Sequence, residues 1–154
     1  MKQGSTLFLK SVLVLLGLTV LGMCGFILPE ALSNENVGDY RFLVFGLCVA
    51  SIPFFIALFQ SWKLLSYIDK NTAFSQASVK ALNNIKYCAL TISGLFAAGM
   101  PYIFDVADKD DAPGVVAMAL IIIFASIVIA AFAALLQKLL QNAIDIKSEN
   151  DLTV

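Results

Sequence analysis

Four long stretches of this chain carry no charged residue, and they constrain its fold more than any other feature. The charge-free stretches are residues 11–29, 42–62, 87–104 and 112–137, which contain 19, 21, 18 and 26 residues. A helix needs roughly 17–25 apolar residues to cross the hydrocarbon core of a bilayer. The stretches therefore predict an all-α fold, an integral membrane bundle of four transmembrane helices.

Composition agrees with a membrane location, because 60% of the residues are hydrophobic and 14% are charged, against about 45–50% and 25% in soluble domains. The first apolar stretch lacks an Ala-x-Ala site and is longer than the apolar part of a signal peptide, so we expect it to remain as a span. We predict one domain, 1–154, with spans at about 8–28, 42–62, 84–104 and 113–137, a link at 63–83 and a tail at 138–154.

The basic residues are distributed unevenly among the connections. Eight of the ten lie around the start of the first span, in the link or within a few residues of its end, or in the tail, whereas the other two connections are acidic. Cytoplasmic segments near membrane spans carry an excess of Lys and Arg. We therefore expect both termini and the link to be cytoplasmic, in a multi-pass protein of the bacterial cytoplasmic (inner) membrane. The eight residues are Lys2, Lys10, Lys63, Lys70, Lys80, Lys86, Lys138 and Lys147.

The polar link carries signals for a helix that runs into span three. Asp69–Asn71 is the predicted turn, Ser75 is the predicted N-cap, and Phe74 and Val79 have the spacing of a hydrophobic staple. The simpler interpretation is a solvated helix end with lysines near lipid headgroups, and the alternative is a surface that binds a cytoplasmic partner. The candidate partner-binding residues are Phe74, Lys80, Asn83, Asn84, Lys86, Lys138 and Asn142.

Span four also continues as a helical pattern, with apolar residues at three- and four-residue spacing past Lys138 and fraying expected only over residues 148–154. Helices three and four are thus predicted to extend into the cytoplasm. Membrane helices pack through small residues, and the candidates lie at four-residue spacing in spans three and four. Whether they pack within one chain or between chains stays open. These packing candidates are Gly94, Ala98, Ser126, Ala130 and Ala134.

Pro53 lies in the middle of span two and is predicted to kink it, as a candidate hinge or as a packing feature. No charged residue lies deep in a span, and the chain contains no His, which argues against proton relays and His-based metal sites. The three Cys residues lack metal-site or redox spacing, and the acidic outer loop, Asp105–Asp111, lacks the spacing of a calcium loop. We predict no enzyme activity, no cofactor and no metal site.

Two segments, "IPFFIALFQSWKLLSYIDKNTAFSQASVKALNNIKYC" and "LQKLLQNAIDIKSENDLTV", resemble the YoaS-like four-span membrane proteins of bacteria, a family of unknown function. The resemblance covers nearly the whole chain and implies no catalytic role. It also implies a gene neighbourhood that includes a small helix-turn-helix regulator, and hence a membrane partner or sensor for a transcription factor.

The leading hypothesis is a non-enzymatic regulatory or sensory membrane protein whose cytoplasmic face contacts such a helix-turn-helix regulator, with no direct contact to nucleic acid. The alternative is a small oligomeric transporter, channel or toxin-immunity component that acts in the bilayer, with further copies of this chain as its partners in a homo-oligomer. A membrane enzyme comes third, since no catalytic motif supports it.

Overall fold

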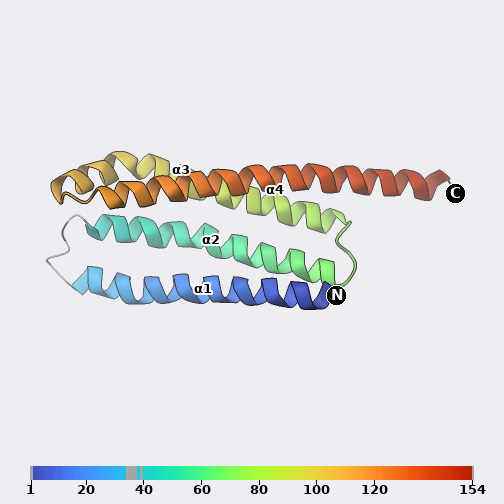
Figure 1. Cartoon of the computed structure of the whole chain (residues 1–154), viewed down its shortest axis with the longest axis horizontal. Helices are drawn as coiled ribbons and strands as arrows, with labels where there is room; N and C mark the ends of the chain where they lie inside the picture. Colours follow the sequence, from blue (N-terminus) through green and yellow to red (C-terminus); the bar gives the residue numbers. More distant parts are fainter. Residues whose placement is uncertain (1, 34–37, 39, 154) are drawn as a thin grey trace.

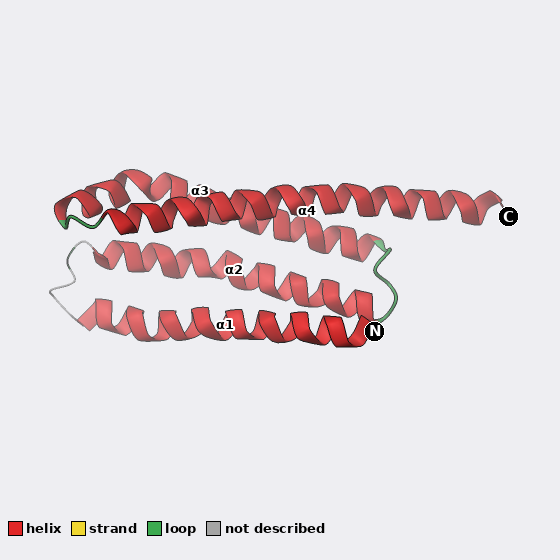
Figure 2. Cartoon of the chain, in the orientation of Figure 1, coloured by secondary structure: helices red, strands yellow, loops and turns green. Residues whose placement is uncertain are grey.

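The computed structural model describes residues 2–33, 38 and 40–153, which form four long helices (Figure 1). They are α1 (Lys2–Ser33), α2 (Tyr40–Asp69), α3 (Gln76–Lys109) and α4 (Pro113–Thr153). Within the described ranges only helices and short connections occur (Figure 2). By length and composition each helix can cross a membrane. This confirms the all-α fold with four helices suited to span a bilayer.

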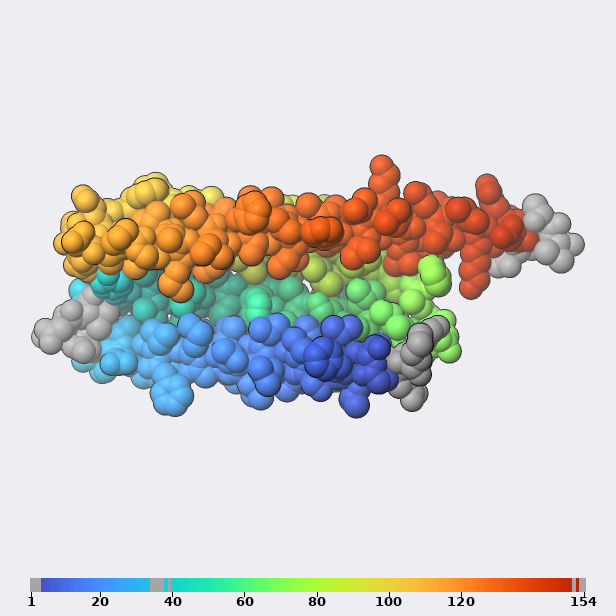
Figure 3. Space-filling view, viewed as in Figure 1, coloured from blue at the N-terminus to red at the C-terminus, as the bar shows by residue number. Residues whose placement is uncertain are grey.

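Each helix packs against the next one along the chain, and the most extensive pairing is between α3 and α4. No comparable contact joins α1 to α4 among the residues described. In Figure 3, α2 is visible at depth between α1 and α4, which form the nearer surface. The bundle is therefore open along one side.

The start of α1, the α2–α3 connection and the end of α4 lie at one end of the bundle, and the α3–α4 connection lies at the other (Figure 1). We call the first of these the basic end, because it gathers the segments that carry eight of the ten basic residues. Successive helices consequently run antiparallel, as the short connections predict. We call the other end the acidic end, because the α3–α4 connection there is flanked by Asp105, Asp108, Asp110 and Asp111.

The helices are longer than the predicted spans. The non-helical part of the link is only residues 70–75, because α2 continues to Asp69 and α3 begins at Gln76. The prediction that the chain frays from Ser148 is wrong, since α4 is helical through Thr153. No Gly or Pro follows Gly114 in the sequence, so the chain contains no strong signal to end this helix.

Candidate functional site

The α2–α3 connection is a tight turn made by the main chain. The amide of Thr72 donates to the carbonyl of Tyr67 at 2.8 Å, and Asn71 has a φ of 59°. Asn adopts this left-handed conformation more readily than most residues. The turn predicted at Asp69–Asn71 is therefore confirmed, and it sets the start of α3 close to the end of α2.

Ser75 is the N-cap of α3, as the sequence predicts, but its side chain does not cap the helix. Its Oγ instead donates to the carbonyl of Thr72 at 2.7 Å. Phe74 leaves 61% of its surface exposed while Val79 is buried, so the predicted staple between them does not cover the ring. The link therefore presents an exposed aromatic side chain immediately before α3.

The first turns of α3 have one buried face and one outward face. Ala81 and Leu82 are buried, whereas Lys80 is exposed and Asn83 and Asn84 are partly exposed. We call Lys80, Asn83 and Asn84 the docking row. Spacings of three and four residues place them on one side of the helix, as the sequence predicts.

The other candidate partner-binding residues lie apart from this row. Lys86 is half-buried, with its Nζ 4.9 Å from the centroid of the Tyr87 ring. Lys138 and Asn142 are exposed on α4. Helical spacing sets Asn142 almost opposite Ser126 and Ala133, which are buried on the face of α4 that packs within the bundle. The predicted candidates thus divide between two helices.

A polar cluster that the sequence did not reveal joins α1 to α2 at the basic end. Lys10 Nζ lies 2.9 Å from one carboxylate oxygen of Asp69, and Thr6 Oγ1 donates to the other oxygen. The same Nζ lies 5.2 Å from the centroid of the Trp62 ring. Because the ion pair is only 18–24% exposed, it is shielded more than a surface pair. It fixes the start of α1 against the end of α2.

The acidic end has a more exposed ion pair than the basic end. Lys109 and Asp105 form an ion pair at 3.1 Å on one exposed turn, a type of contact that contributes about 0–1 kcal/mol. Among the described residues, no group of three or more His, Cys, Asp and Glu side chains is arranged to hold a metal ion. Cys24, Cys48 and Cys88 are free thiols.

The small-residue candidates for helix packing have different surroundings. Ser126 and Ala130 are buried, and Ala134 is half-buried. Gly94 and Ala98 on α3 are exposed, and a Cβ added to Gly94 would meet nothing within 4 Å. Gly94 and Ala98 therefore do not lie in a close helix contact within the described bundle. They remain candidates only for a contact with another molecule. Pro53 lies inside α2, which continues on both sides of it.

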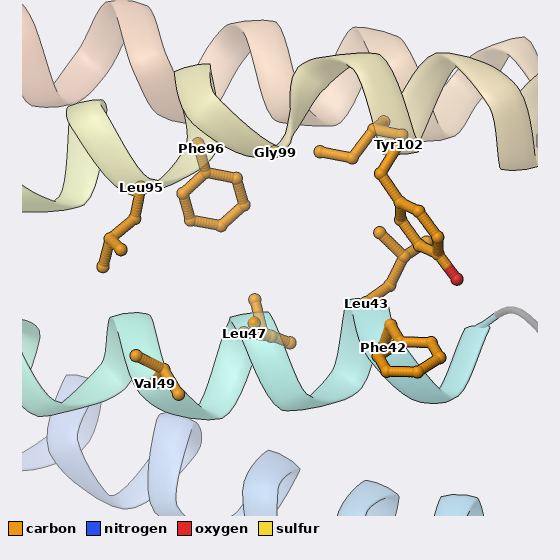
Figure 4. Close-up of a pocket in the computed structure, with 10 residues that line it drawn as sticks. Phe42, Leu43, Leu47, Val49, Leu95, Phe96, Gly99 and Tyr102 are labelled. Atoms are coloured by element: carbon orange, nitrogen blue, oxygen red, sulfur yellow. The ribbon is translucent and has the colours of Figure 1, made fainter.

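Two apolar grooves run between the helices. One, of about 470 Å³, lies between α2 and α3 and is lined by residues such as Phe42, Leu47, Phe96 and Tyr102 (Figure 4). The other, of about 520 Å³, has walls from all four helices. Both are lined almost entirely by apolar side chains, which suit a hydrocarbon ligand better than an ion.

These features define a class, the small multi-span helical membrane proteins with one polar, basic end. The chain belongs to the family described as "Protein of unknown function (DUF2975)", which matches residues 25–154. It is 57% identical over 160 residues to the "Uncharacterized membrane protein YoaS" of Bacillus subtilis (strain 168), with all of both chains covered. This membership confirms the resemblance seen in the sequence. No solved structure matches the chain.

Proposed function

We propose that this chain is a non-enzymatic regulatory or sensory protein of the bacterial cytoplasmic membrane, with its basic end in the cytoplasm. Phe74 and the docking row would bind a partner such as a helix-turn-helix regulator, with Lys86 on α3 and Lys138 on α4 as further candidate contacts. The observation that carries the proposal is the 61% exposure of Phe74, which precedes the exposed Lys80 by six residues in the chain. Exposed aromatic side chains that insert into a partner pocket supply much of the affinity of protein interfaces.

The local geometry supports a protein partner. Asn side chains offer both donors and acceptors, and Lys80 adds a positive charge that steers an acidic surface toward the row. The docking row lies on a helix whose other face is buried, so its backbone is already ordered before binding. Such pre-organisation reduces the entropy cost of association.

The first prediction concerns topology. Reporter fusions or cysteine-accessibility labelling should place Asp108 outside the cell and both Asn71 and Glu149 inside, because eight of ten basic residues belong to the basic end. Labelling of intact and opened cells provides the measurement. A reporter that places Asn71 outside would put the docking row in the wrong compartment and defeat the proposal.

The second prediction separates partner binding from lipid contact. The double variant Asn83→Ala with Asn84→Ala keeps every lysine and raises helix propensity. It should lose most of its crosslinking to a co-expressed helix-turn-helix regulator, while its amount in the membrane and its topology stay normal. Purified membranes, a crosslinker and detection of the regulator supply the measurement.

The matched control is Lys80→Gln with Lys86→Gln, which keeps both asparagines and lowers attraction to anionic lipid by about 1 kcal/mol per lysine near the surface. If only the lysine pair has an effect, on insertion or orientation, the start of α3 is a solvated helix end. Equal capture of the regulator by the asparagine variant and the unchanged protein would likewise reject the docking row.

A second candidate function rests on the groove of about 520 Å³ that all four helices line. A groove with such apolar walls would favour binding or passage of an apolar molecule within the bilayer. This transport-type function becomes the better hypothesis if the asparagine variant binds the regulator normally.

A further inference from the structure

Helix α4 is too long to be covered by the bilayer and by its own bundle. Its 41 residues span about 60 Å at a rise of about 1.5 Å per residue. A bilayer is about 40–45 Å thick with its headgroups, and α4 starts directly after the acidic connection at one surface. α3, its main neighbour, has 34 residues, and Figure 1 shows the end of α4 extending past the other helices. The last turns of α4 therefore stand in water.

The C-terminal part of α4 carries large apolar side chains that the described residues leave largely exposed. Leu139 and Ile146 are 56% and 61% exposed, and Asn142 between them is also exposed. The spacing from Leu135 through Leu139 and Asn142 to Ile146 is four, three and four residues. This is the alternation that places residues in the seam of a coiled coil. We call these four residues the α4 seam.

The same alternation continues into the membrane-spanning part of α4. Phe132 lies three residues before Leu135, and its side chain is 60% exposed. The seam lies opposite Ser126 and Ala133, which are buried on the inward face. α4 therefore has two apolar faces: a small-residue face packed within its own bundle, and a large-residue face left open from the bilayer into water.

We propose that a second copy of this chain covers the α4 seam, through a parallel pairing of the two α4 helices about a two-fold axis along the membrane normal. The pairing goes beyond the proposed function, because the seam residues lie on α4 and the docking row lies on α3. It assigns Asn142 to the seam between the copies rather than to the docking surface.

A second copy fits the seam better than lipid or a soluble partner does. Lipid cannot cover Ile146, which lies about 50 Å along α4 and so beyond the bilayer. A soluble protein cannot cover Phe132 within the bilayer. A copy inserted in the same orientation places apolar residues at bilayer depth and the end of its own α4 in water, as this chain does. A two-fold axis then brings each seam residue to its own equivalent. Asn142 would then meet Asn142 of the second copy, where the two amides can satisfy each other. A single polar seam residue of this kind specifies register.

The test is disulfide crosslinking in membranes that contain the full chain. Leu139→Cys and Ile146→Cys lie on the seam, whereas Gln141→Cys and Ser148→Cys lie on other sides of the same turns. After mild oxidation the seam variants should give roughly tenfold more covalent dimer than the controls, because cysteines with Cα atoms more than about 7 Å apart are not bridged without backbone movement. The unchanged chain, with Cys24, Cys48 and Cys88, sets the background. Equal dimer yields from seam and control variants would overturn the proposal.

A charge placed in the seam gives a second test, which is measured by the same disulfide crosslink. Asn142→Asp, combined with Leu139→Cys, sets two like charges against each other across the two-fold axis. The dimer yield should fall to that of Gln141→Cys. The matched control is Gln141→Glu with Leu139→Cys, which adds the same charge away from the seam and should leave the yield unchanged. An undiminished yield with Asn142→Asp would also overturn the pairing.

Discussion

Replacing Ala130 with leucine should destabilise the bundle and lower its melting temperature in detergent. Ala130 is only 5% exposed and lies between the buried residues Ser126 and Ala133 on α4. A larger side chain holds the helix backbones apart, and membrane helices depend on such close contact. Overpacking of this kind typically costs about 1–3 kcal/mol. For a chain of this length, each kcal/mol corresponds to a loss of roughly 2–4 °C.

The matched control is Ala97→Leu, which makes the same chemical change at an exposed residue of α3. Its added side chain faces detergent or lipid, so the melting temperature should stay close to that of the unchanged protein. Thermal unfolding followed by fluorescence, with size-exclusion elution as a second readout, measures both variants. Equal melting temperatures for Ala130→Leu and the unchanged protein would mean that Ala130 does not lie in a tight helix contact.

The fold was accessible from the sequence because its main signal is one-dimensional. A charge-free run of bilayer length needs no knowledge of its neighbours to be read as a span. Local signals succeeded for the same reason: the turn at Asp69–Asn71 and the N-cap position of Ser75 both depend on adjacent residues only. The helix ends were less accessible, and α4 runs through Thr153 because nothing in its last turns breaks it.

Contacts between helices could not be derived in the same way. Lys10 and Asp69 are separated by 59 positions, and periodicity shows which face a residue occupies without showing which helix covers that face. Gly94 and Ala98 have the same four-residue spacing as Ser126 and Ala130, yet only the second pair is buried. Identical patterns thus have different surroundings, and only the three-dimensional arrangement distinguishes them.

The candidate site also combines features that the sequence predicts with features that only the structure shows. Lys80, Asn83 and Asn84 share one side of α3, as their spacing predicts, because all three belong to one helix. Grouping them with Asn142 required knowledge of how α4 is rotated. The structure sets Asn142 almost opposite the inward face of α4, near the exposed residues Leu139 and Ile146, and this placement is the basis of the proposed pairing of two copies.

Ser78, in the first turn of α3, has a buried hydroxyl whose energetic cost a single substitution can remove. Its side chain is 0% exposed, and its Oγ is the buried side-chain polar atom without a hydrogen-bond partner in the described part of the chain. A buried hydroxyl that forms no hydrogen bond costs about 1–3 kcal/mol. Ser78→Ala removes the oxygen and keeps the Cβ, so it should stabilise the protein by about 1 kcal/mol and raise the melting temperature by roughly 2–4 °C.

Two further variants decide whether the missing hydrogen bond is the cause. Ser61→Ala makes the same change where the hydroxyl already donates to the carbonyl of Ala57 at 2.8 Å, so its melting temperature should stay level or fall slightly. Ser78→Val adds volume at a fully buried position, and it should lower the melting temperature, as overpacking does. A fall in melting temperature for Ser78→Ala, equal to or larger than that for Ser61→Ala, would show that the Ser78 hydroxyl has a stabilising partner. A rise for Ser78→Ala with a fall for Ser78→Val would locate the cost in the hydroxyl itself, at the point where α3 begins beside the exposed Phe74.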